Sequence, residues 1–153
     1  MAVIELKDLS PSGALIGIDP GSKTLGIAAS DELRLIASPV EVIRRGKKLA
    51  PTLLRLWDIY DQRKATGLIM GLPLNMDGSS GPRVQSARAL AKNILSARDI
   101  PLAFFDERLS SVQAERSMLE ADLSRSRRSE LIDASAASLI LQTALDRLSN
   151  TQS

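Results

Sequence analysis

At 153 residues, 44% of them hydrophobic and 25% charged, the chain is long enough to form one globular domain with its own core. It has no run of about 18 apolar residues and no basic segment followed by an apolar one, so we expect a cytoplasmic protein with neither a membrane span nor a signal peptide. The absence of both histidine and cysteine excludes thiolate sites, the usual zinc ligands and nucleophiles activated by histidine, which leaves carboxylates, lysines, hydroxyls or an oxygen-bound metal for any catalysis.

The first third of the chain predicts a tail followed by three antiparallel strands. Residues 1–12 mix charged and apolar side chains and end in turn residues, so we expect a tail there, one domain over 13–149 and a second tail over 150–153. Strands are expected over 15–19, 24–30 and 34–43, where apolar and β-branched residues stand between turn signals. Because the connections are short, these strands should form a meander.

Helices and strands alternate in the rest of the chain. Apolar residues recur with helical spacing over 49–60, and an uninterrupted apolar run over 68–72 predicts a strand buried on both faces. After a loop over 73–81, Pro82 opens a second helix, and the next strand is expected over 101–105.

Two further helices are expected towards the end of the chain. A capping box at Ser110 predicts a third helix. An arginine-rich loop follows, and Ser129 is expected to cap a last helix that begins at Glu130, ends near Leu148 and is apolar almost all round. The element order predicts an α/β fold with a five-stranded mixed sheet, in which the strands that follow helices lie parallel to the first strand.

Carboxylates are expected to gather at the edge of the sheet where the parallel strands end, which is where such sheets bind ligands. Asp19 ends the first strand, and Asp106 and Glu107 end the last. Asp133 stands on the apolar last helix, beside alanines small enough to let that helix approach the sheet closely. Buried carboxylates without histidine favour Mg²⁺ or Mn²⁺, which prefer oxygen ligands.

Each carboxylate also has a simpler interpretation. Asp19 is an ordinary turn residue before Pro-Gly, and Asp133 is an acid near a helix start. Taken alone, Asp106 or Glu107 is better explained as a strand-end charge paired with Arg108.

Basic residues form two clusters, Arg44-Arg45-Gly46-Lys47-Lys48 and Arg125-Ser126-Arg127-Arg128, both of which we expect in loops. Their charge suits contact with phosphates, and a solvated basic loop explains each of them equally well. The stretch 78–83 at the start of the second helix offers backbone amides to a phosphate, or serves only as a helix cap.

Four sequence blocks resemble, in order, those of the YqgF (RuvX) family. They are GIDPGSKTLGIA at 17–28, GLPLNMDGS at 71–79, DERLS at 106–110 and DASAA at 133–137, and the resemblance extends over residues 13–148. It implies an RNase H-like fold related to the RuvC Holliday junction resolvases. It also implies that Asp19, Glu107 and Asp133 are the catalytic acids that bind the metal, with Asp106 as a neighbour of the site.

The resemblance implies a Mg²⁺- or Mn²⁺-dependent nuclease that processes the 5′ end of pre-16S ribosomal RNA in ribosome biogenesis. We expect seven residues to contact the nucleic acid: Gly21, Lys23, Asn75, Arg83, Arg108, Arg127 and Arg128. One alternative is a resolvase acting on branched DNA, which needs a symmetric dimer. The other is a non-catalytic nucleic-acid-binding factor in ribosome assembly or transcription. We expect a monomer or a weak dimer that does not contact a membrane.

Overall fold

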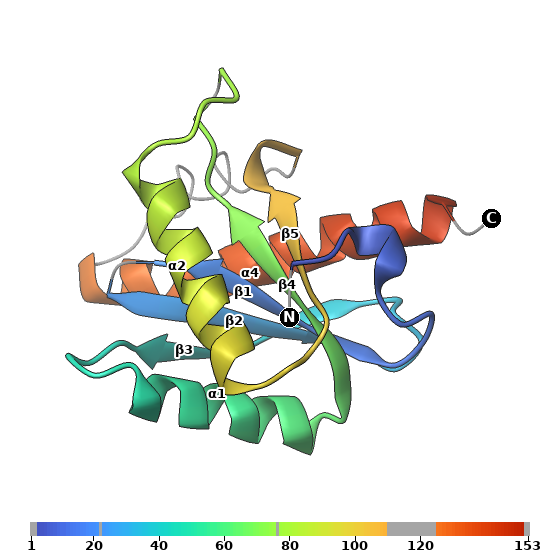
Figure 1. Ribbon diagram of the computed structural model, residues 1–153, viewed down its shortest axis with the longest axis horizontal. Helices are drawn as coiled ribbons and strands as arrows, with labels where there is room; N and C mark the ends of the chain where they lie inside the picture. Colours follow the sequence, from blue (N-terminus) through green and yellow to red (C-terminus); the bar gives the residue numbers. More distant parts are fainter. Residues whose placement is uncertain (1–2, 22, 76, 110–124, 152–153) are drawn as a thin grey trace.

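A single mixed sheet forms the centre of the molecule, in the computed structural model shown in Figure 1. The structure describes residues 3–21, 23–75, 77–109 and 125–151, with backbone alone for 125–135 and 150–151. The strands are β1 (Ala14–Pro20), β2 (Thr24–Ser30), β3 (Ala37–Arg44), β4 (Ala65–Leu72) and β5 (Leu102–Asp106). Their order across the sheet is β3-β2-β1-β4-β5. β1 to β3 pair antiparallel, and β4 and β5 run parallel to β1, which confirms the predicted sheet.

Helices cover both faces of the sheet (Figure 1). They are α1 (Ala50–Gln62), α2 (Pro82–Ala97) and α4 (Arg125–Thr151), with short 3-10 helices η1 (Leu6–Asp8) and η2 (Glu107–Leu109). On one face α1 and α2 pack on strand residues such as Ile18 and Met70. On the other face α4 packs on the residues that alternate with these, such as Leu15 and Ile69. The third helix predicted from Ser110 lies outside the described residues.

The helix α4 approaches β1 closely. A Cβ atom built on Gly17 would lie 2.8 Å from Cβ of Leu141 and 3.2 Å from the carbonyl oxygen of Ala137. The side chains of Ala137 and Leu141 are fully buried. The expected close approach of this helix through small residues is therefore confirmed at Ala137, and a glycine on the strand provides the other half of the space.

A methyl group at this contact should be costly. We expect Gly17→Ala to lower the free energy of unfolding by about 1–3 kcal/mol, because the added carbon overpacks the interface between β1 and α4. Urea titration followed by circular dichroism measures the change. Gly46→Ala is the matched control, since the nearest atom to a Cβ there, the carbonyl oxygen of Lys48, is 4.0 Å away. Equal stabilities of the two variants would contradict the prediction.

Several predicted boundaries are wrong. β4 begins at Ala65 instead of residue 68, because the strand includes Thr66 and Gly67 before the apolar run. β3 begins at Ala37 instead of residue 34, because the carboxylate of Asp31 accepts the backbone N–H groups of Leu35 and Ile36 at 2.8 and 3.0 Å. These N–H groups are then engaged outside the sheet, and Arg34 has a φ of 58°, which breaks the extended backbone.

The last helix begins at Arg125, so the arginine-rich cluster is helical and Ser129 is not its cap. Neither glycine nor proline occurs over 125–151, and arginine and serine are both tolerated inside helices. Nothing in the sequence therefore stops the helix from starting five residues earlier than predicted.

The segment before β1 contacts the free edge of β5. The N–H of Ile4 donates to the carbonyl of Leu102 at 2.8 Å, and Ile4 forms a parallel bridge with Ala103. Leu9 is buried.

The predicted domain limits at residues 12 and 149 stay a prediction. Within the described part of the chain, no helix has both the length and the apolar character needed to cross a membrane.

Candidate active site

The carboxylates of Asp19 and Glu107 lie on the same face of the sheet, the face that α4 covers. Asp19 alternates along β1 with Ile18, which faces the helices on the other side. The register of β1 and β4 pairs Ile18 with Met70, so Asp19 lies beside Gly71. A Cβ atom on Gly71 would come within 2.7 Å of Oε1 of Glu107. The side chain of Glu107 therefore reaches across β4 towards β1 in space that a glycine leaves open.

Both of these carboxylates are buried. Asp19 is 2% exposed and Glu107 is 9% exposed, and no other acidic side chain in the described part of the chain is buried. Ile140 of α4 closes the same space, since its Cδ1 would also lie 2.7 Å from a Cβ on Gly71. Burial of two acids at the carboxyl edge of parallel strands costs free energy unless charge or hydrogen bonds compensate it. This arrangement is typical of functional sites rather than of cores.

Asp106 points to the opposite side of the sheet and is engaged with Arg108. The Nη2 of Arg108 donates to Oδ2 of Asp106 at 2.7 Å, and the Nε and the backbone N–H donate to Oδ1 at 3.0 Å each. These hydrogen bonds hold the pKa of Asp106 below its ordinary value of 3.8 and raise the pKa of Arg108. Asp106 therefore forms the ion pair with Arg108 that its simpler interpretation expects.

The pKa of Asp106 offers a test of this contact. A carboxyl whose pKa is lowered by folding stabilises the fold above its unfolded pKa, and this contribution is lost as the pH falls through the folded pKa. We expect Arg108→Gln to return the pKa of Asp106 towards 3.8, measured by NMR titration of the side-chain carboxyl carbon. Arg83→Gln is the control and should leave it low. An unchanged Asp106 pKa in Arg108→Gln would show that the hydrogen bonds do not cause the shift.

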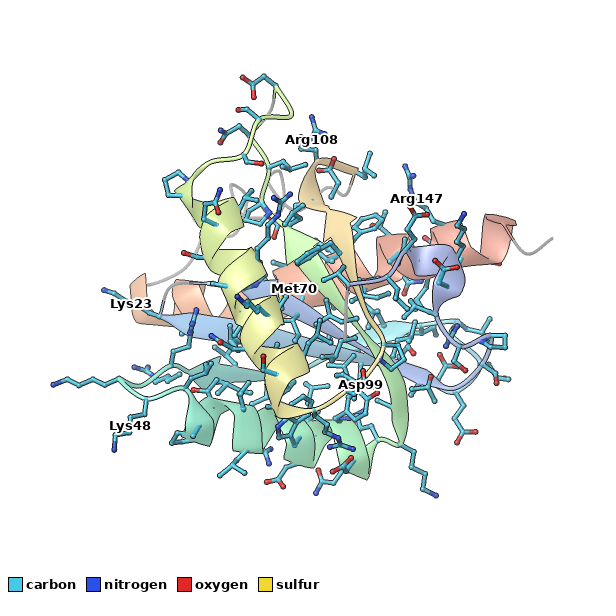
Figure 2. The ribbon with its side chains drawn as sticks, viewed as in Figure 1. Lys23, Lys48, Met70, Asp99, Arg108 and Arg147 are labelled. Atoms are coloured by element: carbon cyan, nitrogen blue, oxygen red, sulfur yellow. The ribbon has the colours of Figure 1, made fainter. Side chains whose placement is uncertain are left out.

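The turn between β1 and β2 brings Gly21 and Lys23 to the carboxyl end of β1. The N–H of Gly21 donates to the carbonyl of Thr24 at 3.0 Å, and a Cβ on Gly21 would lie 2.6 Å from that oxygen. The turn itself therefore requires a glycine at position 21. Lys23 is exposed at the tip of this hairpin and points outward (Figure 2).

The loop between β4 and α2 is closed by its own hydrogen bonds. Asn75 donates through Nδ2 to the hydroxyl of Ser79 at 3.0 Å, and its backbone N–H donates to the carbonyl of the same serine at 3.0 Å. A Cβ on Gly78, which has a φ of 89°, would lie 3.2 Å from Nη1 of Arg108. The loop therefore packs against this arginine, and Arg83 is exposed in the first turn of α2.

The remaining predicted site residues lie in the first half of α4. Asp133 stands one helical turn before Ala137, the residue that contacts β1, and Arg127 and Arg128 lie in the first turn. The side chains of these three residues are outside the described part of the chain. Among the side chains that are described, no three acids gather closely enough to hold a metal ion. The role of Asp133 as a third ligand stays a prediction.

Sequence reasoning gave no individual role to Arg45. Its backbone N–H donates to the carbonyl of Lys23 at 2.8 Å, and its Nη1 donates to the carbonyl of Gly21 at 2.8 Å. This residue connects the basic segment after β3 to the hairpin that carries Asp19. Only its membership of a basic cluster was visible in the sequence.

Solved structures of low sequence identity share this fold. The Thermus thermophilus RuvC in complex with a Holliday junction substrate matches with a TM-score of 0.56 at 17% identity, over 91% of this chain and 97% of that chain. The yeast mitochondrial Holliday junction resolvase matches with a TM-score of 0.51 at 12% identity, over 95% of this chain and 85% of that chain. Together with the sheet order, these matches define an RNase H-like fold of the RuvC type, which confirms the predicted fold class.

Sequence comparison narrows the class to one family. The family model described as "RuvX: Holliday junction resolvase" matches residues 13–147. A Rhodobacter capsulatus protein named "Putative pre-16S rRNA nuclease" is 55% identical over 138 residues, 90% of this chain and 86% of its own length. A Ruegeria pomeroyi protein of the same name is 53% identical over 142 residues, 93% and 92% of the two chains. The chain belongs to the RuvX family, as its four sequence blocks predicted.

Proposed function

We propose that this protein is a divalent-metal-dependent nuclease that hydrolyses phosphodiester bonds at the 5′ end of pre-16S ribosomal RNA, in the cytoplasm. The observation that carries the proposal is the pair of buried carboxylates, Asp19 and Glu107, on one face of the sheet at its carboxyl edge. The names of the relatives support the choice of substrate, since both are called pre-16S rRNA nucleases.

The donor set fits a hard cation such as Mg²⁺ or Mn²⁺. The chain has no histidine or cysteine to offer, and the buried donors are carboxylate oxygens. The space over Gly71, which a Cβ atom would fill, leaves Glu107 room to reach towards Asp19. We assign Asp19, Glu107 and Asp133 as the ligands. When bound, such a cation stabilises the charge that develops on a phosphodiester and favours ionisation of water at neutral pH.

The chain's own contribution is to hold the acids and to orient the substrate. Glu107 is the ligand we choose over Asp106, because Asp106 faces the other side of the sheet and holds Arg108. Lys23, Arg83 and Arg108 are proposed contacts to phosphate, with Lys23 at the hairpin tip. The burial of Asp19 and Glu107 keeps bulk water from screening the charges around the reacting phosphate.

The roles of the other predicted contacts differ. The hydrogen bonds of Asn75 indicate that this residue holds the shape of the loop before α2. We propose that the backbone of this loop contacts a phosphate. Gly21 is proposed as a point of close approach next to Asp19, although its turn also needs a glycine. Arg127 and Arg128 remain proposed contacts at the start of α4.

Incubation with a pre-16S rRNA fragment, with and without EDTA, tests the proposed function directly. Primer extension should find new 5′ ends at the mature terminus of 16S rRNA, and EDTA should abolish them. Cleavage that is unaffected by EDTA would contradict metal dependence. Isothermal titration with Mn²⁺ separates the nuclease from a non-catalytic binding factor, because only the former requires the carboxylates to take up metal.

A resolvase acting on branched DNA is the second candidate, favoured by the family description and by the structural match to RuvC. Cutting two strands of a junction symmetrically requires two copies of the site. Cleavage of a four-way DNA junction by a dimer, with no cleavage of the rRNA fragment, would favour this second candidate. A monomer in gel filtration that is inactive on junctions would count against it.

A further inference from the structure

The basic segment that follows β3 lies at the same end of the sheet as the proposed active site. The register of β2 and β3 pairs Thr24 with Arg44, so β3 ends beside the start of β2. The two hydrogen bonds from Arg45 to the carbonyls of Gly21 and Lys23 tie the segment to the hairpin. Figure 2 shows Lys23 and Lys48 at the same end of the molecule, both pointing outward.

The positive charge of this segment is concentrated and accessible. Four of the five residues over 44–48 are basic, and Lys47 and Lys48 are exposed. The nearest preceding acid, Glu41, is occupied, since it accepts a hydrogen bond of 2.8 Å from Nε of Arg55. Within the described part of the chain, no acid forms an ion pair with Lys23, Lys47 or Lys48. A group of lysines with this exposure is suited to the phosphates of a nucleic acid.

The position of the segment relative to Asp19 indicates what it would hold. Asp19 ends the central strand β1, whereas the segment follows β3 at one edge of the sheet, and Arg108 follows β5 at the other. Four inter-strand spacings of about 4.8 Å separate β3 from β5, which is about 19 Å. A nucleic-acid strand that crosses this edge of the sheet would therefore meet basic residues on both sides of Asp19.

We propose that residues 44–48, together with Lys23, form a phosphate-binding arm that holds the nucleic-acid substrate on the β3 side of the active site. This inference rests on the proposed function, because the arm is defined by its position beside the carboxylates. The arm binds the sugar-phosphate backbone without reading the bases, so it contributes affinity and orientation. It adds contacts on the side opposite to Arg83 and Arg108.

The test measures binding in the absence of cleavage. A fluorescein-labelled RNA covering the 5′ region of the 16S precursor is titrated with protein in EDTA at several salt concentrations, by fluorescence anisotropy. We expect Lys47→Gln/Lys48→Gln to weaken binding several-fold. We also expect it to lower the slope of log K against log salt by about 1.4 for single-stranded contacts or about 1.8 for duplex contacts.

The matched control removes the same charge from the other end of the sheet. Arg63→Gln/Lys64→Gln changes two exposed bases immediately before β4, at the amino end of that strand, and should bind like the wild type. RNAs shortened from either end refine the result. Shortening the RNA from the end that the arm contacts should remove the difference in affinity between the wild type and the arm variant. Shortening it from the other end should leave that difference unchanged.

The outcomes separate the arm from the nuclease. Equal binding by the arm variant, the control and the wild type at every length would overturn the arm, even if the wild type cleaves RNA when metal is added. A wild type that does not bind the RNA in EDTA would also overturn it. Reduced binding by the arm variant alone, in a protein that shows no cleavage with metal, would support the arm and contradict the proposed nuclease.

Discussion

Replacing Asp19 with asparagine is expected to reduce cleavage of pre-16S rRNA by more than about 100-fold, since loss of even an outer-shell partner of a metal ligand costs 10–100-fold. Asparagine has the same size as aspartate, so the packing between β1 and α4 is kept while the negative charge is lost. The rate of appearance of the mature 5′ end, at saturating protein and metal, measures the effect. Calorimetric titration with Mn²⁺ should show weakened metal binding in the same variant.

A matched control separates this effect from a general change in charge. Asp99, which is labelled in Figure 2, is exposed and precedes the amino end of β5, whereas the site lies at the carboxyl ends of the parallel strands. Asp99→Asn should therefore cleave like the wild type. Both variants should unfold cooperatively in urea. Cleavage by Asp19→Asn at the wild-type rate would remove Asp19 from the site.

Glu107→Gln is expected to reduce cleavage by a similarly large factor, whereas Asp106→Asn should lower it only a few-fold. The two residues are adjacent in the chain, but the side chain of Glu107 reaches over Gly71 towards Asp19, while Asp106 holds Arg108 on the other side. The loss of Asp106 releases Arg108 and should weaken substrate binding, which shows as a higher KM at nearly unchanged kcat.

The two variants also serve as controls for each other, because each removes one negative charge at neighbouring positions. Single-turnover cleavage separates a loss of chemistry from a loss of binding. The opposite order, with Asp106→Asn inactive and Glu107→Gln active, would show that the acid on the other face of the sheet binds the metal. The assignment of the ligand would then have to be reversed.

The strands and helices that carry the site are predictable from local patterns. β2 occupies the predicted residues 24–30, and Pro82 opens α2 as expected, because apolar residues between turn signals and a proline at a helix start are strong local signals. Tertiary hydrogen bonds are harder to foresee. The carboxylate of Asp31 captures two N–H groups of a β-branched stretch, and β3 begins later for that reason.

Residue patterns alone left the choice between Asp106 and Glu107 open, and only the family resemblance favoured Glu107. The choice depends on which face of β5 each residue follows, and β5 has no polar alternation to reveal this, since Phe104 packs in the core on one face and Phe105 in the core on the other. The link from Arg45 to the hairpin was equally hidden. It joins residues more than twenty positions apart through backbone carbonyls, which have no sequence signature.

The two edges of the sheet determine how copies of this protein can associate. At β5, the segment around Ile4 already occupies the free edge. At β3, the pairing shifts register at Val40, and the neighbouring Pro39 has no N–H to donate. Such features prevent strand addition from a second molecule. A two-fold assembly able to cut both arms of a branched substrate would therefore have to be built through helices and loops, and the sheet itself would stay five strands wide.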